Sequence, residues 1–149
     1  MLDHVENASR LFEEGYNCAQ AVLCAFGDVT GMDIESSARL ASSFGGGLGR
    51  MREVCGAVSG AAIVLGIARG YSDPRDPEAK KAHYALVQEF CRRFKAEFGS
   101  IVCRELLDGV ETTPGSVPEA RTPAYYDRRP CPSFVRGAAK IVDEMLAEA

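Results

Sequence analysis

The feature that most constrains this chain is a glycine-rich, nearly uncharged stretch at residues 44–70, FGGGLGRMREVCGAVSGAAIVLGIARG. It holds eight glycines, and Val54–Ala68 is the longest nearly charge-free run in the protein. That run is too short to span a bilayer, which needs roughly 20 apolar residues. We therefore predict a buried, Gly/Ala-rich central helix over Val54–Ala68 and no association with a membrane.

Gly56 and Gly60 lie four residues apart, on one face of this predicted helix. Because they lack side chains, another backbone or a cofactor can approach them closely. Tight helix packing is the commoner use of such a pair. For the other use, contact with a cofactor, the candidate residues of this stretch are Gly45, Gly46, Gly47 and Gly56.

Length, charge and the first residues set broad limits on what the protein does. A chain of 149 residues fits one domain, residues 1–149, and is long enough to fold without disulfides or metal. Its net charge of −4 gives no indication of nucleic-acid binding. The N-terminal residues lack the basic start and apolar core of a signal peptide. We therefore expect a cytoplasmic protein, in which thiols are mostly kept reduced.

Apolar residues recur with helical periodicity along most of the chain, which predicts an all-α fold of six or seven helices around Val54–Ala68. The other helices are expected at residues 3–14, 18–26, 34–44, 77–98 and 100–107, and from 131 onward. No segment alternates convincingly like a strand. Residues 108–130 have no apolar period and contain four prolines, so we expect a long loop. Such a loop either covers a functional site or packs across the surface.

Six cysteines in a reducing compartment indicate metal or redox chemistry more than a structural framework. Four of them lie at or near the expected starts of helices, where the helix dipole and unpaired amides favour negative charge. A thiol in that position can have a pKa below its usual value of about 8.5. If these helix starts converge, the chain gathers thiolates in one low-charge pocket. The four are Cys18, Cys55, Cys103 and Cys131.

The remaining two cysteines, Cys24 and Cys91, lie inside expected helices beside apolar neighbours, and we interpret them as core residues. The chain has no C-x-x-C motif, which argues against a thioredoxin-like site or a zinc ribbon. It also lacks the cysteine run of bacterial ferredoxins. Any shared site must therefore be assembled from distant segments, and scattered structural cysteines remain the alternative.

Several of these features together resemble the C_GCAxxG_C_C family of small bacterial and archaeal proteins. The matching residues are N-C at 17–18, F-G-G-G at 44–47, C-G-A-V-S-G at 55–60, Cys103 and Cys131. Members of that family are described as redox proteins of about this length with four shared cysteines. The resemblance implies that the four matching thiols of this chain, Cys18, Cys55, Cys103 and Cys131, act as catalytic groups or as metal ligands.

Our leading hypothesis is a cytoplasmic redox protein with an unidentified redox partner. Its four thiols either hold an iron–sulfur cluster, for which four cysteines are the usual complement, or cycle between thiol and disulfide. One alternative is a structural zinc module, since four cysteinates satisfy tetrahedral zinc. Another is a plain helical interaction module that forms a homodimer through its Gly-rich helix.

Overall fold

The computed structural model describes residues 3–148, in which nine α-helices and one short 3₁₀-helix form and no strand does. The all-α prediction is confirmed, although the expected number of helices was too low, because α3 and α8 were not anticipated. The elements are α1 (His4–Glu13), α2 (Cys18–Ala25), α3 (Gly27–Thr30), α4 (Ile34–Ala41), η1 (Ser42–Phe44), α5 (Gly56–Arg69), α6 (Pro77–Phe98), α7 (Cys103–Leu106), α8 (Pro123–Arg128) and α9 (Cys131–Ala147).

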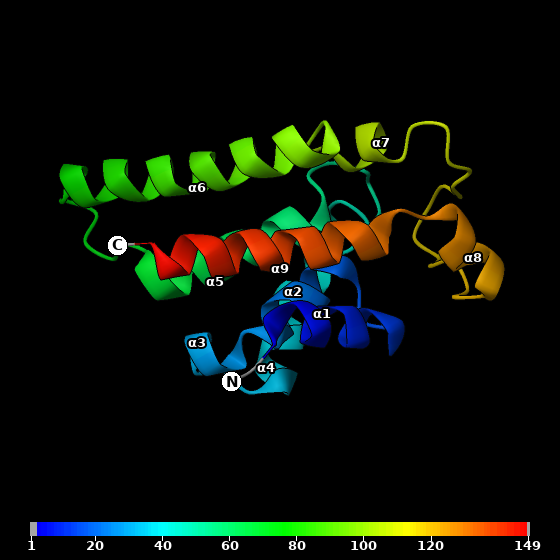
Figure 1. Ribbon diagram of the computed structural model, residues 1–149, viewed down its shortest axis with the longest axis horizontal. Helices are drawn as coiled ribbons and strands as arrows, with labels where there is room; N and C mark the ends of the chain where they lie inside the picture. The colour runs from blue at the N-terminus through cyan, green and yellow to red at the C-terminus, as the bar shows by residue number, and fades with distance from the viewer. Residues whose placement is uncertain (1–2, 149) are drawn as a thin grey trace.

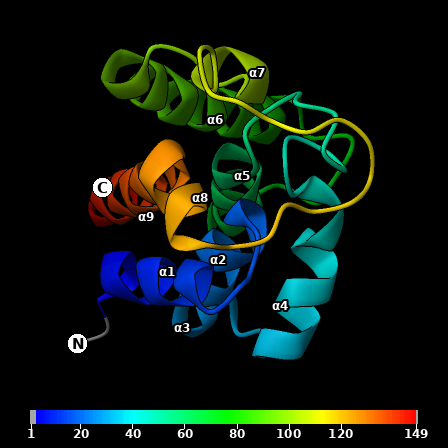
Figure 2. The same ribbon diagram turned by 90° about the vertical axis from the view of Figure 1, so that its right-hand side faces the viewer.

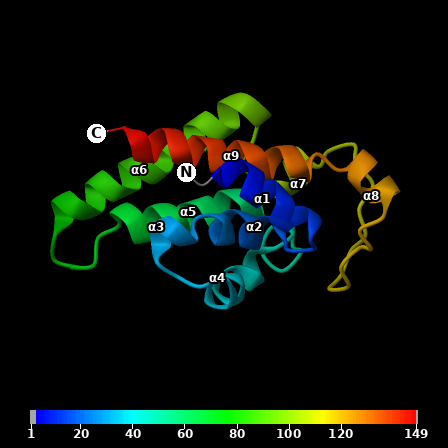
Figure 3. The same ribbon diagram turned by 60° about the horizontal axis from the view of Figure 1, so that its bottom comes forward.

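The helices are stacked in layers around α5 and α9 (Figure 1). The most extensive packing is that of α2 on α5, and α1 packs on both α2 and α9. The long helix α6 covers the other side of α5 and α9 (Figure 1). Helix α4 packs on α2 at the outer edge, which Figure 3 shows from below. Within residues 3–148, every helix is too short or too polar to cross a membrane.

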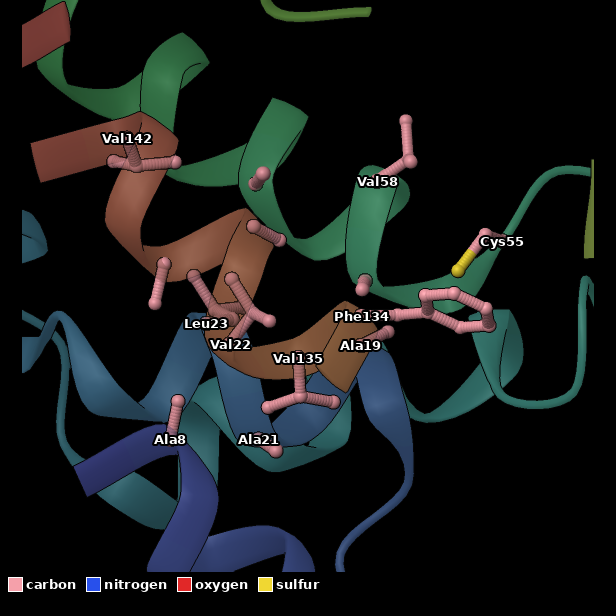
Figure 4. Close-up of a cluster of buried hydrophobic side chains, with 14 of the residues drawn as sticks. Ala8, Ala19, Ala21, Val22, Leu23, Cys55, Val58, Phe134, Val135 and Val142 are labelled. Carbon is pink, nitrogen blue, oxygen red and sulfur yellow. The ribbon is translucent and has the colours of Figure 1, made fainter. Parts of the chain in front are cut away.

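One hydrophobic core runs between these layers. In Figure 4, Val22 and Leu23 of α2 lie beside Val135 of α9, and Cys55 and Phe134 lie at one edge of the cluster. Burying an aliphatic side chain of this size contributes about 1.5–3 kcal/mol to folding. The core therefore fixes how α2, α5 and α9 lie relative to one another, and with them the positions of their first residues.

The central helix α5 begins at Gly56 rather than Val54, with Cys55 as its N-cap. A Cβ added to Gly60 would lie 2.6 Å from the backbone oxygen of Ala19 on α2, and one added to Gly56 would lie 3.2 Å from the Ala19 amide nitrogen. The backbones of α2 and α5 therefore approach closely because both positions are glycine. This agrees with tight helix packing, the commoner of the two interpretations of the Gly56–Gly60 pair.

The chain between the helices differs from expectation in two places. The helix expected at 100–107 begins at Cys103, because the preceding residues are extended and Val102 forms an antiparallel bridge with Val54. The segment 108–130 contains α8, whose N-cap Thr122 accepts a hydrogen bond from the Tyr125 amide and whose first residue is Pro123. Thr-Pro is a recognisable helix start, so this helix was missed although its signal was present.

Candidate functional site

A pocket of about 380 Å³ opens at one end of the helix bundle, and all four family-type cysteines line it. Figure 2 faces this end of the molecule, where the chain between α7 and α8 crosses in front of α2 and α5. The thiols come from four separate elements: Cys18 from α2, Cys55 from the N-cap of α5, Cys103 from α7 and Cys131 from α9. The expected convergence of four helix starts is thus observed.

Cys18 owes its place to a well-formed helix start. The side chain of Asn17 accepts a hydrogen bond from the Gln20 amide (2.9 Å), and the Gln20 side chain accepts one from the Asn17 amide (3.0 Å). This reciprocal pair is a capping box, and it makes Cys18 the first residue of α2. Cys131 is likewise the first residue of α9, where it follows Pro130.

Cys55 and Cys103 are brought together by the isolated bridge between Val54 and Val102. The Cys55 amide donates to the Ile101 carbonyl (2.8 Å), and the Cys103 amide donates to the Glu53 carbonyl (2.6 Å). Side chains alternate along extended chains, so the two cysteines lie on the same face of this bridge, opposite the two valines. Sequence reasoning gave no signal for this pairing.

The Gly-rich turn packs against this pair. A Cβ added to Gly47 would lie 2.7 Å from the Cβ of Cys103, and one added to Gly45 would lie 2.4 Å from the Asn17 side chain. Gly45, Gly46, Gly47 and Gly56 all line the pocket. Protein atoms crowd these glycines, which accounts for the absence of side chains there; their contact with a cofactor remains a prediction.

The other two cysteines lie away from the pocket. Cys24 and Cys91 are half-buried and pack against the hydrophobic core, and neither lines the pocket. Their interpretation as packing residues agrees with this placement. None of the six cysteines, all of which the structure describes, forms a disulfide.

Cys18 and Cys131 line the same pocket, and each thiol affects the ionisation of the other. The neighbouring Cys18 thiol lowers the pKa of Cys131 to about 7, and the nearby charges of Arg129 and Arg121 act in the same direction against the opposing effect of burial. The proximity of Cys131, with burial, raises the pKa of Cys18 well above its ordinary value. Of the two thiols, Cys131 therefore ionises first and Cys18 keeps its proton.

The other two thiols do not have the lowered pKa that a helix start can give a cysteine. Burial raises the pKa of Cys55 to about 12, although the amides of Ala57 and Val58 act in the opposite direction. Burial also raises the pKa of Cys103, although the charge of the neighbouring Arg52 opposes it. Removal from water disfavours the charged form, and at these two sites that cost exceeds the stabilisation from a helix start.

The sequence led us to expect a pocket of low charge, but the pocket walls are charged. It is lined by Arg50, Arg52, Arg121 and Arg129 and by a single carboxylate, Glu119. Burial works against ionisation of Glu119, but its hydrogen bond from the Thr113 amide and the charge of Arg129 keep its pKa below the ordinary value. The walls therefore carry excess positive charge around the Cys131 thiolate.

Residues 108–130 supply one wall of this pocket, which agrees with the first of the two roles that the sequence left open. Arg129 donates a hydrogen bond to Glu119 and lies 4.9 Å from the ring centre of Tyr125. Arg121 stacks on Phe12 at 4.1 Å and donates to the Phe12 and Tyr16 carbonyls at 2.8 and 3.0 Å. These contacts fix the loop against α1 and hold Arg121 and Arg129 in the wall of the pocket.

The arrangement of the donor atoms bears on the metal hypothesis. Within residues 3–148, no group of three or more Cys, His, Asp or Glu side chains is arranged to hold a metal ion. The four cysteines therefore share a pocket without forming a ready set of ligands for zinc. Their assignment as metal ligands, and the iron–sulfur cluster itself, remain predictions.

Comparison with known proteins gives one match. The model of the family described as "Putative redox-active protein (C_GCAxxG_C_C)" matches residues 16–145, which include all four pocket cysteines. No curated protein and no solved structure matches the chain. Because the matched region covers most of its length, this chain belongs to the C_GCAxxG_C_C family.

Proposed function

We propose that this protein performs thiol–disulfide redox chemistry in the pocket, with Cys131 as the attacking thiolate and Cys18 as the resolving thiol. The observation that carries the proposal is that both thiols line one pocket together with Arg129 and Arg121. A thiol whose pKa lies near the ambient pH combines a useful thiolate fraction with good nucleophilicity. The pKa of about 7 places Cys131 in that range.

The chemistry follows from the protonation states. The Cys131 thiolate attacks one sulfur of a substrate disulfide, and the first substrate thiolate leaves and takes a proton. Cys18 then loses its proton and attacks the Cys131 sulfur of the mixed disulfide, which releases the second substrate thiol. The protein ends as a Cys18–Cys131 disulfide, and the substrate has gained two electrons and two protons. An external dithiol, the unidentified redox partner expected from the sequence, then restores the reduced pair.

Cys55 and Cys103 have a secondary part in this proposal. Their pKa values are raised by burial, so both stay protonated at neutral pH and react after the first pair. A reducing cytoplasm, the compartment expected from the sequence, would keep all four thiols reduced at rest.

The test is mild oxidation of the reduced protein with one equivalent of diamide, followed by counting free thiols and mapping disulfides by peptide mass spectrometry. We expect two thiols to be lost and a Cys18–Cys131 disulfide to form. Cys18→Ser and Cys131→Ser should each prevent it, whereas Cys24→Ser and Cys91→Ser are matched controls that should leave it unchanged. Equal effects of all four substitutions would refute the assignment.

An iron–sulfur cluster is the second candidate, and what favours it is that four thiols and four arginines line one pocket. Four cysteines are the usual ligand set of a cluster, and the arginines would offset its negative charge. Iron, sulfide and zinc analysis of protein purified without oxygen separates the cases. Cluster-like iron and sulfide that disappear in Cys55→Ser would establish the cluster, and zinc alone would favour the structural module.

A further inference from the structure

The four arginines of the pocket differ in how fully protein atoms satisfy them. Arg50 donates to the Gly115 carbonyl (2.6 Å) and to the Thr113 carbonyl and hydroxyl (3.1 and 2.9 Å). Arg121 is occupied by the two α1-side carbonyls described above. These two guanidinium groups therefore serve mainly to hold the pocket wall together.

Arg52 and Arg129 each keep a buried N–H group without a partner. Nη2 of Arg52 and Nε of Arg129 are shielded from solvent and donate to no acceptor among residues 3–148. Only 4% of the Arg129 side chain is exposed, and its remaining bond goes to Glu119. Buried donors are satisfied in the great majority of cases, so two such groups in one pocket indicate a missing acceptor.

The two unpartnered N–H groups belong to arginines that lie beside cysteines of the pocket. Arg129 lies beside Cys131, and Arg52 lies beside Cys103. Both arginines line the pocket, and Glu119 is the one carboxylate there among the described residues. An acceptor that reached both guanidinium groups would thus lie next to the thiols and would be negatively charged, because charged acceptors form the stronger bonds with arginine.

The rest of the pocket suits a small organic molecule. Its walls include Phe12, Leu106, Leu107 and Phe134, and its volume of about 380 Å³ lies within the usual range for ligand pockets, roughly 300–1,000 Å³. Cys55, Cys103 and Cys131 are only 4%, 8% and 8% exposed. A disulfide held on the surface of another protein could not reach these sulfurs without opening the pocket.

From these observations we infer that the pocket takes a low-molecular-weight disulfide that bears carboxylate groups, with Arg52 and Arg129 binding a carboxylate and placing the disulfide against Cys131. This inference rests on the proposed thiol–disulfide function and names its substrate class. The reaction is the two-electron exchange described above, in which the substrate becomes two thiols and the protein gains the Cys18–Cys131 disulfide.

The experiment is a single-turnover reaction of the fully reduced protein, which needs no added reductant. Three disulfides of similar size serve as probes: dithiodipropionate, a dicarboxylate; bis(hydroxyethyl) disulfide, which is neutral; and cystamine, which is dicationic. Each rate is divided by the rate of free cysteine with the same probe, which removes the intrinsic reactivity of the disulfide. We expect the normalised rate for the dicarboxylate to exceed that for the neutral probe at least tenfold, and cystamine to be the slowest.

Arg52→Gln tests the binding role of one guanidinium without touching the Cys131 pair directly. It should remove most of the preference for the dicarboxylate over the neutral probe. Arg75→Gln, which lies outside the thiol pocket, is the matched control and should change neither rate. Arg52→Lys should retain part of the preference because it keeps the charge.

The outcomes separate this inference from the function on which it rests. Equal normalised rates for all three probes, with the Cys18–Cys131 disulfide formed each time, would overturn the carboxylate inference and leave the proposed function intact. Failure of every probe to form that disulfide would overturn the proposed function. Protection of Cys131 from alkylation by inorganic sulfate, but not by propionate, would show that the pocket takes an inorganic anion and would overturn the organic assignment.

Discussion

Two cysteines of the thiol pocket occupy comparable places in the fold and differ in acidity. Cys131 and Cys55 both lie at the start of a long helix, yet the pKa is about 7 for Cys131 and about 12 for Cys55. The helix dipole is common to both. What differs is the neighbourhood, because Cys131 has the Cys18 thiol and two arginines, whereas Cys55 has only its own helix amides to offset burial. A helix start alone therefore does not activate a buried thiol, and the charged neighbours decide.

The largest expected effect is the difference in reactivity between these two cysteines. At pH 7 the pKa values give Cys131 a far larger thiolate fraction, partly offset by the higher intrinsic nucleophilicity of a less acidic thiol, so iodoacetamide should label Cys131 about 100-fold faster than Cys55. Labelling of Cys131 should rise with pH with a midpoint near 7. Pulse labelling with peptide mass spectrometry measures both rates, and similar rates would contradict the comparison.

A second prediction concerns the contact between α5 and α2, the helix that begins with Cys18. Gly60→Ala places a Cβ against the Ala19 carbonyl, so α2 and α5 must move apart, and overpacking of this kind costs about 1–3 kcal/mol of stability. The shift displaces Cys18, whereas the bridge that holds Cys55 and Cys103 is untouched. Urea unfolding measures the loss.

The matched control is Gly66→Ala in the same helix. A Cβ there meets nothing within 4 Å, so the change should stabilise α5 by about 0.5–1 kcal/mol through helix propensity. If both variants had the same stability, the close approach of α2 and α5 would not matter energetically.

A third prediction concerns the neighbour that we hold responsible for the acidity of Cys131. Arg129→Gln removes its charge, so the pKa of Cys131 should rise and its labelling rate at pH 7 should fall about three- to tenfold. Because Arg129 also pairs with Glu119, stability will fall as well. The shift of the pH midpoint distinguishes the electrostatic effect from unfolding, and Arg129→Lys should retain part of it. If the midpoint stayed near pH 7 in Arg129→Gln, the lowered pKa of Cys131 would have to be attributed to Cys18 instead.

The smallest expected effect concerns His4, far from the pocket. Burial and neighbouring groups act on its pKa in opposite directions, as they do on the pKa of Cys131. Its Nδ1 faces Asp143 at 2.6 Å and its Nε2 faces Asp28 at 2.8 Å. Burial acts to lower the pKa of His4, but the hydrogen bonds with Asp28 and Asp143 outweigh it and raise the pKa above 6.5. The charged form is therefore stabilised by folding.

This stabilisation is fully present below pH 6.5 and is lost as the pH rises through the raised pKa of His4. The contribution of His4 to the free energy of unfolding should fall over that range by less than about 1 kcal/mol, since both carboxylates are well exposed. Ionisation of Cys131 acts in the opposite direction in the same pH range, so the effect is measured as a difference between variants. In denaturant titrations between pH 5.5 and 8.5, the stability difference between the native protein and His4→Gln should shrink as the pH rises, whereas the difference from His83→Gln should not change. If His4→Gln had the same pH dependence of stability as the native protein, that contribution would have to come from another group.

The parts of the site that were predictable from sequence depend on local signals. Asn17 before Cys18 is a helix cap, and Pro132 after Cys131 occupies the first turn, so the placement of these two thiols at helix starts follows from their neighbours. The all-α fold and the packing role of Gly60 follow from periodicity and spacing in the same way.

The parts that were not predictable depend on contacts between distant segments. The bridge of Val54 with Val102 involves one residue pair 48 positions apart, too little to produce an alternating pattern. Arg52 and Arg129 come from two loops, and nothing in either segment indicates that they meet at the same pocket. The pKa values of the thiols follow from burial and from neighbours of this kind, so they could not be inferred from helix position alone.

The Gly-rich turn carries an unusual backbone that affects how this protein can evolve. Residues 46–50 all have positive φ, and so does Arg52, which places two arginines, with φ of 64° and 62°, in a conformation that suits glycine. Each arginine in this conformation costs roughly 1–2 kcal/mol. A glycine at position 52 would therefore stabilise the fold while removing one of the unpartnered guanidinium groups. Selection for stability alone would therefore favour glycine at position 52 and would remove part of the positive charge of the pocket.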